Sequence, residues 1–270
     1  MLRHYSACLL SIYLHMLKET LFRAAHAGGT VLKEHFNTSF QIHQKDGINN
    51  LVTEIDHACE QAIIQAIHNE FPQHPILSEE CGQIEGATDY KWIIDPIDGT
   101  VNFAHSIPIC CVSIALEKNK QIQMGVVFNP LINEFFFAEK GQGAFLNDQR
   151  IFVSQNKDIE KACLATGFPY SLLDAANGPL DVFNALIRKG IPVRRLGSAA
   201  IDLCYVACGR FDGFYEHQLQ PWDTAAGFLI VTEAGGKVTN MSGADYTPTM
   251  QSIVATNGKI HASLMEYICN

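Results

Sequence analysis

WIIDPIDGT, at residues 92–100, is the stretch that decides which fold and which chemistry this chain is expected to have. The apolar run Trp92-Ile93-Ile94 predicts a short buried strand. Asp95 and Asp98 follow that strand, and carboxylate oxygens are the ligands that hard divalent cations prefer. Pro96 lacks a backbone N–H, so it fixes the turn between the two acids. The stretch therefore predicts a strand that leads into a candidate magnesium and phosphate site.

Gly99 and Thr100 complete this candidate site. A glycine lets the backbone approach a ligand closely. A helix that begins near Thr100 would direct free N–H groups at an anion. The same residue types also dominate ordinary turns and helix N-caps. Residues 95–100 alone therefore leave a metal site and a plain turn equally open.

Two more acidic clusters, far away in the sequence, favour the metal site. Glu79 and Glu80 follow the apolar run Pro75-Ile76-Leu77, and Asp223 lies in the segment PWDTAAG at residues 221–227. Each cluster adjoins a predicted regular element that can hold it rigidly. Carboxylates that come from three separate places and meet at one point would form a metal-binding cage.

Composition limits the classes of partner. The chain has 270 residues, of which 47% are hydrophobic and 17% are charged, as in a globular protein with a substantial core. The formal net charge is −9, and no run of Lys and Arg is present, which argues against nucleic acid as the main partner. An acidic protein that handles a phosphate ester needs local positive charge. Bound divalent cations would supply it.

Nine cysteines favour a reducing compartment over a disulfide framework. Their number is odd, no C-x-x-C pair occurs, and Cys110-Cys111 lie within an apolar run. Cys204 and Cys208 are one helical turn apart, and a packed helix face explains this spacing better than half a metal site does. We therefore expect reduced thiols and a cytoplasmic location.

The N-terminus needs a separate decision. Residues 1–14 resemble a signal peptide, but a cut near Ala27 would divide a segment that otherwise has the periodicity of one helix. We therefore expect residues 1–15 to be an extension of uncertain order, and residues 16–270 to be a single domain. No other stretch approaches the length of a membrane span, so no membrane association is expected.

The predicted elements indicate a layered α+β fold. The first half, to about residue 150, is rich in strands, whereas the second half, from about residue 151, alternates strands and helices. The predicted helices cover residues 16–36, 53–69, 181–189, 199–208 and 222–234. The predicted strands cover residues 76–77, 92–94, 109–117, 122–128, 134–139, 193–196, 213–215, 236–238 and 252–255, with another near Leu164.

These motifs resemble the two signatures of the inositol monophosphatase family. WIIDPIDGT at 92–100 and WD-x-AAG at 222–227 stand in the right order and at the right separation. The similarity extends over nearly the whole chain from about Met16, and it includes LVTEID at 51–56 and LSEE at 77–80. Residues 196–213 look especially like the bacterial inositol-1-monophosphatase branch.

The resemblance implies a layered α-β-α-β-α sandwich of the inositol monophosphatase and fructose-1,6-bisphosphatase type, usually as a homodimer. It also implies two or three Mg²⁺ ions in each site. Glu79, Asp95 and the carbonyl of Ile97 would hold the first ion. Asp95, Asp98 and Asp223 would hold the second, and Glu79 with water would hold a weaker third.

The resemblance assigns the contacts to substrate as well. Gly99 and Thr100 would meet the phosphate, and Glu216, Ser198 and Ala199 would contact substrate hydroxyls. Glu216 also has a plainer explanation as a solvated charge at a strand end.

The catalytic roles follow from the same assignment. Glu79 and Thr100 would orient and activate the attacking water, and Asp95 would bridge the two metals. We expect no covalent phosphoenzyme, because water is the nucleophile. Asp223 could instead serve only as the N-cap of its helix, or it could do both.

A few further residues are possible members of the site. Lys45 and Asp56 match family positions, and Arg194-Arg195 could attract an anion or could make a structural or dimer contact. Two departures from the family pattern occur, namely Val101 where threonine is common and Ser78 where glycine is often found. Neither departure affects a metal ligand, so they bear on loop geometry and substrate preference.

The sequence thus predicts a magnesium-dependent phosphomonoesterase. The resemblance implies that it releases phosphate from inositol monophosphate and that lithium inhibits it. Within the same fold, 3'-phosphoadenosine 5'-phosphate, histidinol phosphate and fructose 1,6-bisphosphate are alternative substrates. A nucleotide site would be expected to offer an aromatic stacking surface, whereas Glu216 favours a ligand rich in hydroxyls. An alternative of another class is a regulatory scaffold whose phosphatase activity is incidental.

Overall fold

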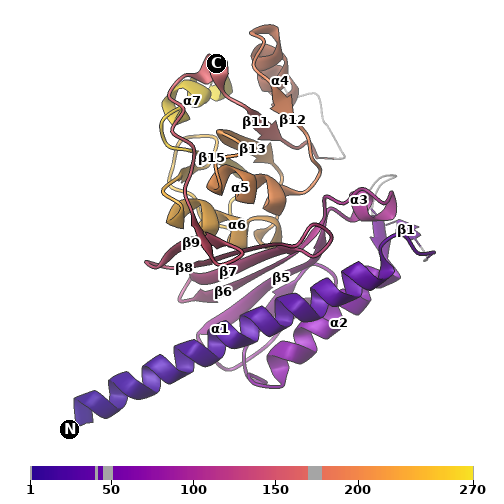
Figure 1. Ribbon diagram of the computed structural model, residues 1–270, viewed down its shortest axis with the longest axis vertical. Helices are drawn as coiled ribbons and strands as arrows, with labels where there is room; N and C mark the ends of the chain where they lie inside the picture. Colours follow the sequence, from indigo (N-terminus) through magenta and orange to yellow (C-terminus); the bar gives the residue numbers. More distant parts are fainter. Residues whose placement is uncertain (1, 40–41, 45–50, 170–177, 270) are drawn as a thin grey trace.

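Five layers alternate as helices, sheet, helices, sheet and helices in the computed structural model (Figure 1). The structure describes residues 2–39, 42–44, 51–169 and 178–269. Its helices are α1 (Leu2–His35), α2 (Glu54–His68), α3 (Thr100–Ala104), α4 (Pro179–Arg188), α5 (Ala199–Ala207), α6 (Pro221–Glu233) and α7 (His261–Cys269), with a short 3-10 turn at Ile159–Lys161. This arrangement confirms the predicted α-β-α-β-α sandwich.

The first half of the chain forms an eight-stranded sheet in the order β10-β9-β8-β7-β6-β5-β3-β4. All its neighbouring strands are antiparallel except β3 and β5, which run parallel. The strands are β3 (Ile76–Ser78), β4 (Gly82–Ile84), β5 (Tyr90–Asp98), β6 (Cys111–Lys118), β7 (Gln121–Asn129), β8 (Glu134–Glu139), β9 (Gly143–Leu146) and β10 (Gln149–Ile151). A separate hairpin pairs β1 (Ile42–Gln44) with β2 (Leu51–Thr53).

The second half forms a five-stranded sheet in the order β12-β11-β13-β15-β14. Its first three strands are parallel, and β15 is antiparallel to both of its neighbours. The strands are β11 (Leu164–Thr166), β12 (Val193–Arg194), β13 (Gly213–His217), β14 (Lys237–Thr239) and β15 (Ser252–Thr256).

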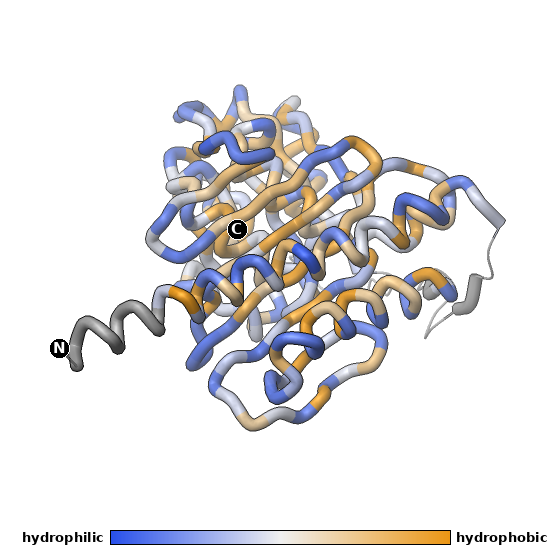
Figure 2. The backbone as a smooth tube through the Cα atoms, turned by 60° about the horizontal axis from the view of Figure 1, so that its bottom comes forward, coloured by the Kyte–Doolittle hydropathy of each residue, from blue (hydrophilic) through white to orange (hydrophobic). Residues whose placement is uncertain are grey.

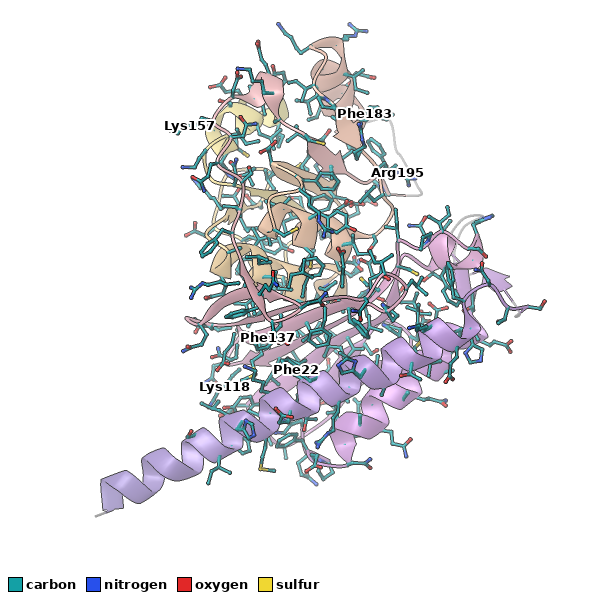
Figure 3. The ribbon with its side chains drawn as sticks, in the orientation of Figure 1. Phe22, Lys118, Phe137, Lys157, Phe183 and Arg195 are labelled. Atoms are coloured by element: carbon teal, nitrogen blue, oxygen red, sulfur yellow. The ribbon has the colours of Figure 1, made fainter. Side chains whose placement is uncertain are left out.

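Three apolar cores fill the spaces between the five layers. The first lies between α1, α2 and the large sheet, the second contains α5 and α6 between the two sheets, and the third lies under α4 and α7. Phe22 of α1 meets Phe137 of β8 edge-on, with ring centroids 4.9 Å apart (Figure 3). Hydrophobic residues recur along α1 and α2 among hydrophilic ones (Figure 2), which is the pattern of helices that bury one face.

Helix α1 begins well before the predicted start at Met16. The side chain of Tyr13 already packs against the first core, and its hydroxyl lies 3.0 Å from Nε2 of His74. The proposed boundary at residues 15 and 16 stays a prediction. Among the described residues, no helix combines the length and the apolar character that crossing a membrane requires.

Strand β5 is much longer than the predicted strand over residues 92–94. It continues through both acids to Asp98, and the pairing with β6 changes register between Asp95 and Asp98. The cause is Pro96, which has no N–H to give to the ladder. Asp98 then pairs again, opposite Cys111. The two carboxylates are therefore fixed by a strand, not by a turn after it.

Candidate active site

Parallel pairing places Glu79 beside Asp95. Strands β3 and β5 align Ser78 with Ile94, so their carboxyl ends reach the same edge of the large sheet. The N–H of Glu79 donates to the carbonyl of Ile94 over 3.2 Å. The first two predicted acidic clusters are thus neighbours, as expected where parallel strands end together.

Gly99 and Thr100 turn the chain away from β5. Gly99 has a φ of 94°, a left-handed conformation, and a Cβ there would lie only 2.8 Å from the carbonyl oxygen of Ile109. Glycine is needed for both reasons. Thr100 begins the predicted helix, α3, which has only five residues. Its hydroxyl lies 3.0 Å from Oδ1 of Asp56 and 3.0 Å from the carbonyl oxygen of Ile97.

The N-terminus of α5 holds the carboxylate of Asp98. Oδ2 of Asp98 accepts from the hydroxyl of Ser198 and from the N–H of Ala200, each over 2.7 Å. Ser198 is also the N-cap of α5. The thiol of Cys111 lies 4.0 Å from the same Asp98 oxygen. Ser198, predicted as a substrate contact, is thus engaged with a predicted metal ligand, and Ala199 lies buried beside it.

Asp223 lies in the first turn of α6. Gln220 is the N-cap of that helix, Pro221 occupies the first turn, and Asp223 stands at the N3 position. Oδ2 of Asp223 accepts from the N–H of Gln220 over 2.7 Å, which closes a capping box. Asp223 is therefore not the N-cap, and its carboxylate is held by one oxygen at a helix N-terminus.

These carboxylates concentrate negative charge away from water. Burial, followed by the charges of Glu79, Asp98 and Asp223, raises the pKa of Asp95 well above its usual value. Burial also raises the pKa of Asp98 to about 6, although the bonds from α5 oppose this shift. The pKa of Asp223 is raised by burial and then by the charge of Asp98. Each acid therefore lies close enough to another to feel its charge.

The charge of these acids suits a divalent cation. Oδ1 of Asp95 is buried without a hydrogen-bond partner, which is costly unless a proton or a cation meets it. Bound cations remove the repulsion that otherwise raises these pKa values. As it stands, no group of three or more His, Cys, Asp or Glu side chains in the described part of the chain is drawn together tightly enough to hold a metal. Oδ2 of Asp98 and of Asp223 each accept backbone bonds instead.

Asp56 supports Thr100 from helix α2. Its Oδ2 accepts from the N–H of Thr53 over 2.8 Å and from the hydroxyl of the same residue over 2.6 Å. Thr53 and Asp56 thus form a capping box at the start of α2. Burial raises the pKa of Asp56, while the bonds from Thr53 and Thr100 oppose the rise. Asp56 is therefore a buried acceptor that orients the Thr100 hydroxyl.

Glu216 borders the site from the small sheet. It stands on β13 and packs so closely on Gly167 that a Cβ at residue 167 would lie 2.1 Å from its Oε1. Burial and then the charge of Asp98 raise its pKa to about 8, and Arg195, labelled in Figure 3, lowers it in part. Asp202 of α5 also faces Glu216, and its buried Oδ1 has no hydrogen-bond partner.

The structure brings some of the predicted residues together and leaves others apart. Glu79, Asp95, Asp98 and Asp223 are brought together, Arg194 lies exposed on β12, and Lys45 lies outside the described residues. Sequence reasoning missed several residues that contact the site. They come from distant segments. For two of them, Glu60 and Asp202, the only sequence signal would have been a position one helical turn from a predicted residue. They are Glu60, Cys111, Ala200 and Asp202.

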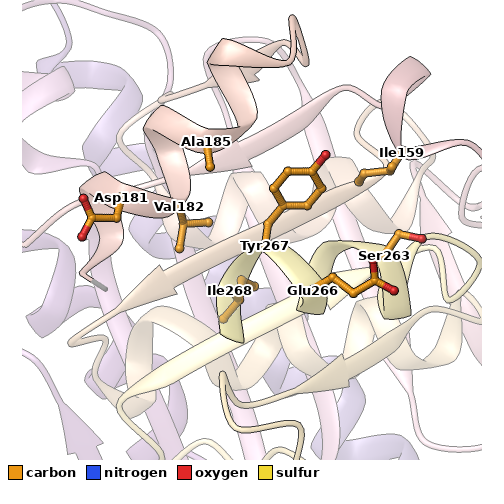
Figure 4. A pocket seen from close by; sticks show the side chains of 8 residues that line it. All are labelled: Ile159, Asp181, Val182, Ala185, Ser263, Glu266, Tyr267 and Ile268. Carbon is orange, nitrogen blue, oxygen red and sulfur yellow. The ribbon is translucent and has the colours of Figure 1, made fainter. Parts of the chain in front are cut away.

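A cavity of about 530 Å³ lies away from these residues, between α4 and α7 (Figure 4). Apolar and acidic side chains line it, and none of the predicted site residues does. Six of its residues are Asp181, Val182, Ala185, Ser263, Glu266 and Tyr267. The candidate active site is therefore the carboxylate cluster and not this cavity.

Comparison with known proteins gives a consistent result. The model of the inositol monophosphatase family matches residues 14–270. "Nus factor SuhB" of Escherichia coli strain K12 is 39% identical over 254 residues, which cover 93% of this chain and 95% of that protein. The crystal structure of extragenic suppressor protein suhB from Bartonella henselae superposes with a TM-score of 0.89 at 37% identity, covering 94% of this chain and 98% of that one. The inositol monophosphatase from Anabaena superposes with a TM-score of 0.82 at 38% identity, covering 95% and 96%.

Proposed function

Because this chain belongs to the inositol monophosphatase family, we propose that it is a magnesium-dependent phosphomonoesterase that releases phosphate from inositol monophosphate. The observation that supports the proposal most is the buried, unpartnered Oδ1 of Asp95 among Glu79, Asp98 and Asp223. Such an excess of negative charge fits divalent cations that also neutralise a phosphate ester.

Each acid has a proposed role at the metal centre. Glu79, Asp95 and the carbonyl of Ile97 would hold one Mg²⁺, while Asp95, Asp98 and Asp223 would hold another. A third ion would depend on Glu79. Bound Mg²⁺ would supply neutralisation of the phosphoryl charge and acidification of the attacking water.

The remaining residues orient the reactants. Thr100, held by Asp56, would hold the attacking water together with Glu79, and Gly99 would let the backbone approach the phosphate. Such placement removes the entropy cost of bringing the reactants together, a large share of the barrier in phosphate hydrolysis. Glu216 would accept hydrogen bonds from substrate hydroxyls.

The substrate, assembly and location are further parts of this proposal. A polyol phosphate suits Glu216 better than a nucleotide does, because a nucleotide would call for an aromatic stacking surface. Histidinol phosphate and fructose 1,6-bisphosphate are the remaining alternatives. We expect a homodimer in the cytoplasm, inhibited by lithium that takes a magnesium position. The eight cysteines whose side chains the structure describes are free thiols, which is consistent with a reducing compartment.

Asp223→Asn tests the proposed reaction. The amide keeps the size of the side chain but removes the charge that a cation needs, so phosphate release should fall by about 10³-fold or more. Asp245→Asn, an exposed substitution elsewhere, is the matched control and should leave the rate unchanged. Phosphate release with Mg²⁺ should be measured over inositol, sugar, nucleotide and amino-alcohol phosphates. Full activity of Asp223→Asn would overturn the proposal.

A second candidate function is a protein partner in transcription. It is favoured by the relatives named "Nus factor SuhB", whose identity of 39–41% extends over more than nine-tenths of this chain. If this function is separate from catalysis, Asp95→Asn should retain a transcription-complex partner as well as the wild type does. Loss of the partner together with phosphatase activity would show that the two depend on the same site.

A further inference from the structure

Helix α2 carries a second buried carboxylate, Glu60, one turn beyond Asp56. Glu60 is only 4% exposed, and its Oε1 accepts hydrogen bonds from three donors at the end of β3. These donors are the hydroxyl of Ser78, the N–H of Glu80 over 3.2 Å and the N–H of Cys81 over 3.1 Å. None of the roles proposed above uses the Glu60 carboxylate.

The three donors surround Glu79 in the sequence. Ser78 precedes it, and the bonded amides of Glu80 and Cys81 follow it. The N–H of Glu79 itself donates to the carbonyl of Ile94 in β5. The backbone of Glu79 is thus fixed from both sides. Hydrogen bonds to an ionised carboxylate are roughly twice as strong as neutral ones, so this anchor is a firm one.

The same face of α2 holds Thr100. Residues four apart on a helix are neighbours on one face. Asp56 accepts from the hydroxyl of Thr100, and Glu60 accepts from the segment around Glu79. One rigid helix therefore connects the two residues proposed above to hold the attacking water.

We propose that Glu60 is a positioning residue that sets Glu79 relative to Thr100 and the metal site. The inference rests on the proposed function for its catalytic meaning. Ser78 contributes to the anchor in this chain, because glycine, often found at this position in the family pattern, would lack the hydroxyl that Glu60 accepts. Glu60 touches no reacting atom and acts only through the Glu79 segment.

Glu60→Gln tests the proposal with little change in shape. The amide keeps one acceptor oxygen but loses the charge that strengthens all three bonds. Binding of Mn²⁺, used in place of Mg²⁺ and measured by electron paramagnetic resonance without substrate, should weaken about tenfold. kcat should fall by a similar factor, while KM for inositol monophosphate changes by less than twofold. Amide hydrogen exchange of residues 79–82 should become faster.

Two more variants keep the test decisive. Ser78→Ala leaves the buried Glu60 in place, so it should fold more readily than Glu60→Gln. Because it removes one of the three donors, it should weaken Mn²⁺ binding about threefold. Glu85→Gln, an exposed glutamate outside the anchor, should change neither binding nor exchange. Unchanged Mn²⁺ binding in both Glu60→Gln and Ser78→Ala, with only a lower melting temperature, would overturn the proposal.

The readouts also separate this proposal from the proposed function. A wild-type protein that releases no phosphate from any substrate would overturn the phosphatase reaction. Mn²⁺ binding and amide exchange of the Glu79 segment would still decide the role of Glu60 in that case.

Discussion

The two halves of the molecule bring groups to the same site by different means. Before Ile151, Glu79 and Asp95 come from the ends of parallel strands, so the hydrogen bonds of the sheet hold them. After Ile151, Asp223 and the amide of Ala200 come from the first turns of α6 and α5. Strands give rigid spacing, whereas helix N-termini give partial positive charge. The second half thus offsets part of the negative charge that the first half concentrates.

The largest expected effect comes from removing the acid at the centre of this arrangement. Asp95→Asn should lower phosphate release by about 10³-fold or more, because the proposed bridge between two cations is lost. In buffer with a chelator, the same variant should melt at a higher temperature than the wild type, since repulsion from Glu79, Asp98 and Asp223 is relieved. Phosphate assays and melting curves with and without Mg²⁺ check both outcomes.

Asp89→Asn is the matched control for that experiment. Asp89 is exposed and lies immediately before β5, so its loss should alter neither the rate nor the response to Mg²⁺. An Asp95→Asn protein that keeps more than a tenth of the activity, or that still gains stability from Mg²⁺ as the wild type does, would contradict the assigned bridge.

The next effect concerns acid stability, to which one buried histidine in each half contributes. His74 and His261 both have a pKa lowered to about 4, mainly by burial. Both rings are neutral in the fold, so their contribution to stability is complete above pH 6.5 and is lost as the pH falls from 6.5 to 4. We expect a loss of about 2 kcal/mol per histidine at pH 4. Urea unfolding across this range measures it.

The two histidines differ in their partners, and this sharpens the comparison. Trp92 Nε1 can only donate, so Nδ1 of His74 must accept and Nε2 must carry the proton. His261 lies between the hydroxyls of Thr239 and Thr256, which can turn to accept from a charged ring. At low pH, the first half of the molecule should therefore unfold locally before the second half does. Faster acid-induced amide exchange in α7 than in α2 would show the reverse.

The carboxylates of the site must be separated from this effect. Asp98 has a pKa raised from 3.8 to about 6, so the cost of its charge to stability is full above pH 6 and is relieved as the pH falls from 6 to 3.8. Stability from this group therefore rises on acidification, opposite to the histidines. His74→Phe should remove only the share of the pH dependence of stability that comes from His74. A wild-type and a His74→Phe curve that stay parallel between pH 6.5 and 4.5 would contradict the assignment.

Sequence patterns predicted the parts of the fold that depend on local periodicity. Helices such as α2 and α6 and the meander from β6 to β8 were predicted within a few residues, because apolar positions recur at the right period and Asn119-Lys120 marks a turn. Helix α7 and strands β9 and β10 were not predicted. They are short, and their positions depend on contacts with segments far away in the sequence.

The site was predictable to the extent that it lies in contiguous motifs. Asp95 and Asp98 stand next to an apolar strand, and Asp223 opens a helix, so their roles could be proposed from neighbours in the chain. Glu60 could not be identified in this way, since its partners are 18 to 21 residues away. Cys111 contacts Ser198, 87 residues later. Only folding reveals such pairs.

An intermediate effect, on KM, is expected at Glu216, the residue of the second half proposed to bind substrate hydroxyls. In Gly167→Ala the new methyl group would overlap the Glu216 carboxylate, which must then move. KM for inositol monophosphate should rise about tenfold, while hydrolysis of p-nitrophenyl phosphate, which lacks the polyol, should change by less than twofold. Glu216→Gln should show the same selectivity. An equal loss on both substrates would place Glu216 outside substrate recognition.

The smallest effect separates two buried thiols of the same core. Cys111 of β6 and Cys204 of α5 are both fully buried, and replacing either by alanine should cost about 1 kcal/mol of unfolding free energy. Only the Cys111 thiol reaches the oxygens of Ser198 and Asp98, at 3.7 and 4.0 Å. Cys111→Ala should therefore lower kcat about threefold and Cys204→Ala should not. Equal kcat values at equal loss of stability would mean that α5 alone holds Asp98, and that the first half contributes the carboxylate without orienting it.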